Sequence, residues 1–105
     1  MPSSDFYIDP NALNDATHGV SCEGIDNITV TTVQMDDGSA WGTCVFTVER
    51  GPSVNGPWSS LATINQAAST SITDVDGIGA VRVRISTIEG ASGLARVLIF
   101  TERKV

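Results

Sequence analysis

From about residue 27 onward, apolar and polar side chains alternate along the chain. Between residues 80 and 88 one face is made by Val81, Val83 and Ile85. In residues 43–50 one face carries Cys44, Phe46 and Val48, and the other carries Thr43, Thr47 and Glu49. A period of two is typical of β-strands that bury one face. The pattern predicts six strands, over residues 27–35, 43–50, 58–64, 69–73, 80–88 and 94–102, and a seventh near residues 20–23.

Short connections rich in glycine, proline and aspartate separate the expected strands. Residues 36–39 read Asp-Asp-Gly-Ser, and residues 51–57 contain four glycines or prolines. Such residues favour turns, and connections this short are too brief for the crossovers that parallel strands need. The sequence therefore predicts an all-β fold: an antiparallel β-sandwich of six to eight strands, immunoglobulin-like or jelly-roll-like, with an extended N-terminal arm.

The first 22 residues differ from the rest of the chain. They are rich in Asp, Asn and Pro and show no sustained period. Within them, Phe6, Tyr7 and Ile8 form a compact apolar cluster. We expect residues 1–22 to form an extended arm and residues 23–105 to form the sandwich domain. The aromatic cluster would dock the arm either on the chain's own sheet or on a neighbouring subunit.

Composition supports the β assignment and narrows the function. Val, Ile and Thr number 11, 9 and 11, whereas Leu occurs four times and Lys once. β-Branched residues suit strands better than helices, so a helix bundle is excluded. Twelve acidic residues against six basic ones give a net charge of −6, which argues against a nucleic-acid binder. The start lacks a signal-peptide pattern and no stretch is apolar enough for a membrane span, so we expect assembly in a cytoplasm with Cys22 and Cys44 reduced.

No catalytic constellation stands out along the chain. His18 is the only histidine, and no third group in the sequence orients it with Cys22. Residues 74–77 read Asp-Val-Asp-Gly, but the other ligands of a calcium loop are missing. We therefore expect no enzyme activity, no metal site and no cofactor. Trp58 opens a strand after a Gly-Pro turn and is interpreted as a core anchor.

The last expected strand has large apolar side chains on both faces. Val97 and Ile99 share one face, and Leu98 and Phe100 share the other. Either this strand is covered on both sides or it exposes Leu98 and Phe100 to a partner, because exposed apolar patches usually mark interfaces. The predicted protein-interface residues are Phe6, Tyr7, Ile8, Leu98, Phe100 and Trp41.

A resemblance adds to this picture. Residues 44–64 combine a strand that ends in Glu-Arg, a loop containing Asn-Gly, Trp58 and a short strand; Asp76-Gly77 then precedes Ala-Val-Arg-Val-Arg-Ile-Ser at residues 80–86. Over residues 27–101 this order resembles small β-sandwich structural proteins of tailed-bacteriophage virions, such as capsid decoration and other head or neck components. Fibronectin type III domains share the first half, but Ala80-Val81 stands where they usually place a tyrosine.

The resemblance implies a non-enzymatic virion structural protein that is assembled in the host cytoplasm. Its first implied role is a capsid decoration (cement) protein that stabilises the phage head by binding across capsomers. Its partner would be the major capsid protein or another virion protein, and it would form a homo-oligomer, with a trimer as one option. The alternatives are a structural protein of the head–tail connector, tail or baseplate, and a carbohydrate-binding β-sandwich module. Neither nucleic acid nor a membrane is expected as a partner.

Overall fold

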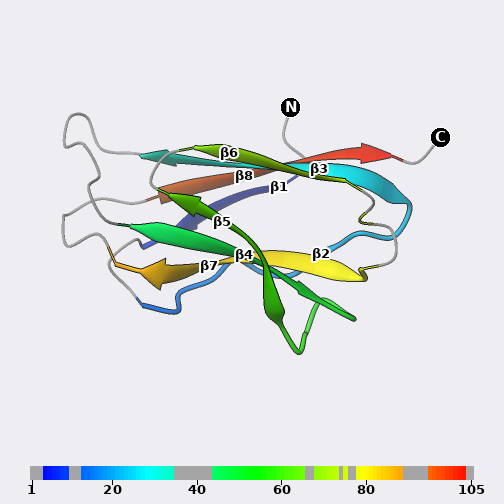
Figure 1. The fold of residues 1–105 in the computed structure, drawn as a ribbon, viewed down its shortest axis with the longest axis horizontal. Coiled ribbons are helices and arrows are strands. Elements are labelled where there is room, and N and C mark those ends of the chain that lie inside the picture. The colour runs from blue at the N-terminus through cyan, green and yellow to red at the C-terminus, as the bar shows by residue number, and fades with distance from the viewer. Residues whose placement is uncertain are drawn as a thin grey trace.

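Two four-stranded sheets pack face to face in the computed structural model (Figure 1). The structure describes residues 4–9, 13–34, 44–65, 68–73, 75, 78–88 and 95–103. Within these ranges no residue is helical, and every strand pair is antiparallel. The predicted all-β antiparallel sandwich is confirmed.

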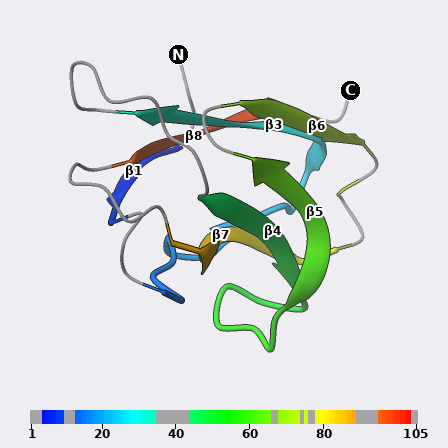
Figure 2. The same ribbon diagram turned by 60° about the vertical axis from the view of Figure 1, so that its left-hand side comes forward.

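Eight strands make up the two sheets. They are β1 (Ser4–Ile8), β2 (Val20–Ser21), β3 (Ile25–Gln34), β4 (Val45–Gly51), β5 (Ser59–Asn65), β6 (Ser69–Thr73), β7 (Ala80–Thr87) and β8 (Ala95–Arg103). The order β1-β8-β3-β6 forms the first sheet, here called sheet A, and the order β2-β7-β4-β5 forms the second, sheet B. Figure 2 shows these layers from another side, with β6 in the upper one and β5 in the lower one.

The strand order is that of a jelly roll. The first strand pairs with the last, the second with the seventh, the third with the sixth and the fourth with the fifth. Such an order arises when a ribbon of paired strands is rolled into two sheets. In an immunoglobulin sandwich the last strand lies beside the strand that precedes it. Here β8 lies in sheet A and β7 in sheet B, so the jelly-roll alternative holds.

The N-terminal residues lie along the edges of both sheets. β1 pairs with β8, placing Phe6 opposite Val97. Residues 14–21 then follow the edge of β7, where the Thr17 N–H donates to the Val83 carbonyl at 2.9 Å. Residues expected to form an arm thus dock on the chain's own sheets, which is the first of the two docking places considered for the aromatic cluster.

The core lies between the sheets and follows the alternation read from the sequence. Val81, Val83 and Ile85 are fully buried. Thr47 and Glu49 lie on the opposite face of β4, as the alternation predicts, but they are only 5% and 6% exposed. They are covered because β4 is a central strand: side chains from β7 lie over its outer face, with Arg82 and Arg84 both bonded to Glu49.

The loop between β4 and β5 is held by close backbone contacts. A Cβ added at Gly79 would lie 2.6 Å from the Pro52 carbonyl oxygen, and one added at Gly19 would lie 2.4 Å from the Val54 carbonyl oxygen. Gly79 also has a φ of +100°, a conformation that residues with a side chain rarely adopt. The loop can therefore pack this closely only against glycine.

We expect Gly79→Ala to lower the free energy of unfolding by about 2–4 kcal/mol, because the added methyl group meets backbone atoms and the φ is strained. Gly24→Ala is the matched control. Gly24 has a φ of +73° but open space around its missing Cβ, so its cost is about 1 kcal/mol. Urea unfolding measures both variants, and equal losses would show that the loop contact is unimportant.

Candidate functional site

The outer face of sheet A carries several large apolar side chains. We define the sheet A outer face by the side chains that the strand register places there: Asp5, Tyr7, Asn27, Thr29, Thr31, Val33, Arg96, Leu98, Phe100 and Glu102. They share a face because alternate residues of a strand point the same way. Leu98 lies opposite Thr31, and Phe100 lies opposite Thr29.

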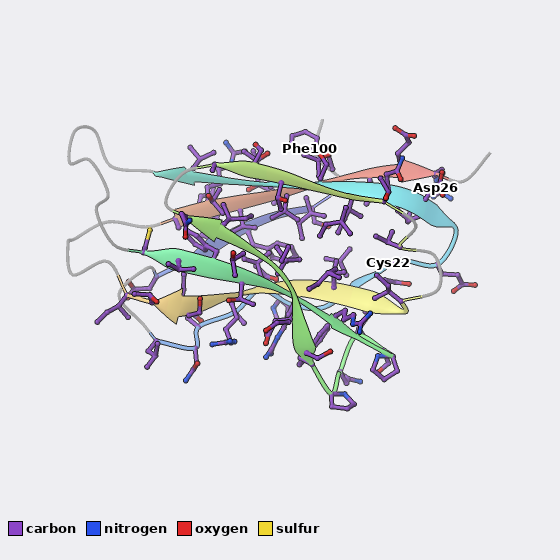
Figure 3. All side chains as sticks on the ribbon, in the orientation of Figure 1. Cys22, Asp26 and Phe100 are labelled. Carbon is purple, nitrogen blue, oxygen red and sulfur yellow. The ribbon has the colours of Figure 1, made fainter. Side chains whose placement is uncertain are left out.

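These side chains point away from the core. Phe100 stands out from the surface of the sandwich (Figure 3). Tyr7 is 57% exposed, and Leu98 and Phe100 are half-buried. No second layer of described residues covers this face. The strand with two apolar faces thus uses one face for the core and presents the other to solvent.

On the β3 side, the polar neighbours of Leu98 and Phe100 are hydroxyl groups that bond to one another. The Thr29 and Ser71 hydroxyls are 3.1 Å apart, and the Thr31 and Ser69 hydroxyls are 2.8 Å apart. These rows connect β3 to β6 without any charge. A surface of apolar groups and mutually bonded hydroxyls loses little hydration when a partner covers it.

An ion pair lies at the β1 margin of this face. Arg96 donates through Nε and Nη2 to the two carboxylate oxygens of Asp5, at 2.9 and 2.6 Å. These hydrogen bonds lower the pKa of the Asp5 carboxyl below its ordinary value, and the positive charge of Arg96 acts in the same direction. A bidentate pair of this kind fixes geometry as well as charge, so it holds β1 in register on β8.

The outer face of sheet B is different in character. The buried Glu49 carboxylate accepts from Nε of Arg82 at 2.8 Å and lies 3.2 Å from Nε of Arg84. The Arg82 guanidinium also lies 4.8 Å from the centre of the Trp58 ring. Trp58 is half-buried and touches Gly51 and Gly56. These charges bond within the chain, so this face has less to offer a partner.

The structure brings together only part of the predicted interface. Tyr7, Leu98 and Phe100 share the sheet A outer face. Phe6 packs partly against the core and Ile8 is only 4% exposed, so both point inward from β1. Trp41 lies outside the described residues.

The sequence reasoning missed Val33 and the hydroxyl rows of β3. Alternation in residues 27–35 puts Thr29, Thr31 and Val33 on one face, which was a usable signal. Their proximity to Leu98 and Phe100 could not be inferred from the sequence, because it depends on β3 and β8 being neighbours.

Among the described residues no cluster of metal-binding side chains is found. No three His, Cys, Asp or Glu side chains among them come close enough to hold an ion, and Asp74 and Asp76 lie outside the described ranges. Two hollows of 240 and 440 Å³ flank the β4–β5 loop; the first is lined by Arg50 and the second by Glu23. None of the described segments forms a helix able to cross a membrane.

Fold and surface together define an eight-stranded jelly-roll domain with one partly apolar outer face, on which the charged groups of Asp5, Arg96 and Glu102 bond within the chain. The sequence matches no protein-family model. No protein of curated function is significantly similar to it in sequence.

Solved structures share the fold. The SPBc2 prophage-derived protein YomS is 11% identical, with a TM-score of 0.57 over 94% of this chain and 95% of that protein. PirA is also 11% identical, with a TM-score of 0.52 over 94% of this chain and 92% of that protein. At these identities the similarity establishes the fold alone.

The Asp5–Arg96 pair predicts a pH effect. Because the Asp5 pKa is lower in the folded state than in the unfolded chain, the pair stabilises the fold fully above the unfolded pKa. That contribution is lost as the pH falls through the folded pKa. A carboxyl-carbon NMR titration should give an Asp5 pKa below the ordinary value of an aspartate, and Arg96→Met should raise the pKa back towards that ordinary value. An unchanged pKa in Arg96→Met would contradict the assignment.

Proposed function

We propose that this chain is a non-enzymatic structural protein of a phage particle, and that it acts as a capsid decoration protein. It would dock on the head through the sheet A outer face and stabilise the shell by bridging capsomers. The observation that carries the proposal is this face: half-buried Leu98 and Phe100 and exposed Tyr7 share it, hydroxyl rows flank Leu98 and Phe100 on the β3 side, the Asp5–Arg96 pair lies on the β1 side, and no described layer covers it.

The fold comparison supports the class of protein. YomS, which has the same fold over nearly the whole of both chains, is described as prophage-derived. The sequence itself resembles decoration, head and neck proteins over residues 27–101. Both observations favour a virion component over a host enzyme.

The physical properties of the face suit a cement role. Its side chains stand on three adjacent strands whose backbones are bonded to one another, so little conformational entropy is lost on docking. Apolar area gains about 25 cal/mol per Å² when it is covered, and a specific interface needs about 800 Å² from each partner. Covering such area across a capsomer junction would raise the free energy of disassembly.

The other candidate functions use the surface differently. A connector, tail or baseplate subunit would use the same face on another virion protein. A carbohydrate-binding module typically presents several open aromatic rings on one face. Trp58 is packed between Arg82 and two glycines, and the exposed Tyr7 shares its face with the aliphatic side chains of Val33 and Leu98. The described residues therefore favour a protein partner.

Two charge-matched variants test the docking face. Phe100→Asp puts a carboxylate at the centre of the sheet A outer face, and Thr63→Asp puts one on the exposed outer side of β5 in sheet B. In cosedimentation with heads that lack this subunit, we expect the wild type to bind saturably and Phe100→Asp to bind at least about tenfold more weakly. That factor is the order expected when a charge is buried unpaired in an interface. Thr63→Asp should bind like the wild type.

Circular dichroism of both variants controls for folding. If the wild type does not bind heads saturably, the decoration role is refuted, and binding to purified tails or baseplates would favour the alternative position. If Phe100→Asp and Thr63→Asp bind equally well, docking occurs elsewhere on the protein.

A further inference from the structure

β6 is an edge strand without the usual protection against pairing. It closes sheet A on the side away from β1, and only β3 pairs with it among the described strands (Figure 1). Its sequence, Ser-Thr-Ser-Ile-Thr, has no charge and no proline, and its register with β3 runs without a bulge. Soluble proteins normally block exposed edges with one of these features, because a bare edge can template another strand.

The other three edges are blocked. β1 carries the Asp5–Arg96 pair, β2 has only two residues, and β5 has a register shift opposite β4. A short strand or a bulge interrupts the row of main-chain groups that an incoming strand would need, and charged side chains on the edge strand disfavour its approach. The contrast singles out β6.

The main-chain groups that β6 leaves open can be assigned. The Thr32 N–H donates to the Ala68 carbonyl at 2.9 Å, so the main-chain groups of residue 68 point towards β3. By the alternation of an antiparallel ladder, the main-chain groups of Thr70 and Ile72 do so as well. The N–H and C=O groups of Ser69, Ser71 and Thr73 therefore point away from β3. No described residue bonds to them on that side.

We propose that β6 pairs with β6 of a second copy of this chain across a twofold axis. With Ser71 opposite its own copy, Ser69 lies opposite Thr73 of the second copy, and every outward N–H meets an outward C=O. Thr70 and Ile72 then lie opposite each other on the inner side. There the Thr70 and Ile72 side chains of the second copy would cover Ile72 and Leu61 of the first, which pack against the core but are partly exposed at this edge.

A second copy fits this edge better than an unrelated strand does. Copies of a chain with a net charge of −6 repel one another over most approaches, but β6 contains none of the twelve acidic residues. The outward side chains of β6 are all hydroxyls, so the rows that bond Thr29 to Ser71 and Thr31 to Ser69 extend into the second copy. A closed twofold pair also leaves no further β6 edge for growth into fibres.

Five residues of edge pairing bury less than the roughly 800 Å² per partner of a standard interface. The expected dimer is therefore weak, with a dissociation constant of about 100 μM. Sedimentation equilibrium of the isolated wild-type chain up to about 1 mM should show a monomer–dimer equilibrium with no larger species.

A charge swap at Ser71 tests the register. Ser71→Lys or Ser71→Glu would place like charges directly opposite each other across the axis, which destabilises cross-strand pairs. We expect each variant alone to dimerise at least about tenfold more weakly, and the equimolar mixture to regain dimer. Ser71 is exposed on the outer side of an edge strand, so both variants should fold. Thr63→Lys and Thr63→Glu, on the edge strand of sheet B, should leave the wild-type dimer unchanged.

Three outcomes would overturn the inference: a wild type that stays monomeric at about 1 mM, a dimer that survives Ser71→Lys, and a mixture of the two Ser71 variants that stays monomeric. Because no particle is present in these measurements, they stand or fall independently of head binding.

Discussion

The fold depends on the pairing of the last strand with both the first strand and the third. β8 lies between β1 and β3, and its Val97 and Ile99 side chains are fully buried in the core. Without β8, sheet A would have no link between its N-terminal edge and its remaining strands. The same strand places Leu98 and Phe100 on the opposite face, beside the hydroxyl rows of β3. Core and candidate docking surface are therefore two faces of one strand, and a change in its register by one residue would exchange them.

Strand alternation explains why much of this could be predicted from sequence. Residues 80–88 predicted the buried face of β7 correctly, and residues 94–102 revealed a strand with two apolar faces. The strand order could not be predicted, since the choice between jelly-roll and immunoglobulin topology depends on which strands become neighbours. β1 was not predicted as a strand, because five residues are too few to show a sustained alternation of apolar and polar side chains. The ion-pair partner of Asp5, Arg96, also lies 91 residues further along the chain. The burial of Glu49 was likewise hidden, because two arginines on a neighbouring strand make it tolerable.

The outer faces of the two sheets differ in where their charged groups lie. On sheet B, the Glu49 carboxylate lies between two guanidiniums, and Trp58 packs under one of them. These interactions connect β4, β7 and the start of β5 and rigidify that sheet. On sheet A, Asp5 and Arg96 pair at one margin while Asn27 donates to Glu102 at 3.2 Å. Between them lies a surface whose polar groups are already bonded to one another.

If β6 pairs with β6 of a second copy, the pairing also joins the sheet A outer faces of the two copies. In an antiparallel pair, residues that lie opposite each other point to the same side of the sheet, so the sheet A outer faces of two copies would lie side by side on one continuous eight-stranded surface. Two weak docking faces joined rigidly in this way bind a repetitive lattice with an effective concentration that neither has alone. A dimer with a dissociation constant near 100 μM would then matter little in dilute solution. It would matter strongly on a shell, because neighbouring binding sites hold the copies together. Weak self-association and a modest apolar face are thus compatible with stable decoration, because the contacts between copies and the contacts with the shell together hold each subunit in place.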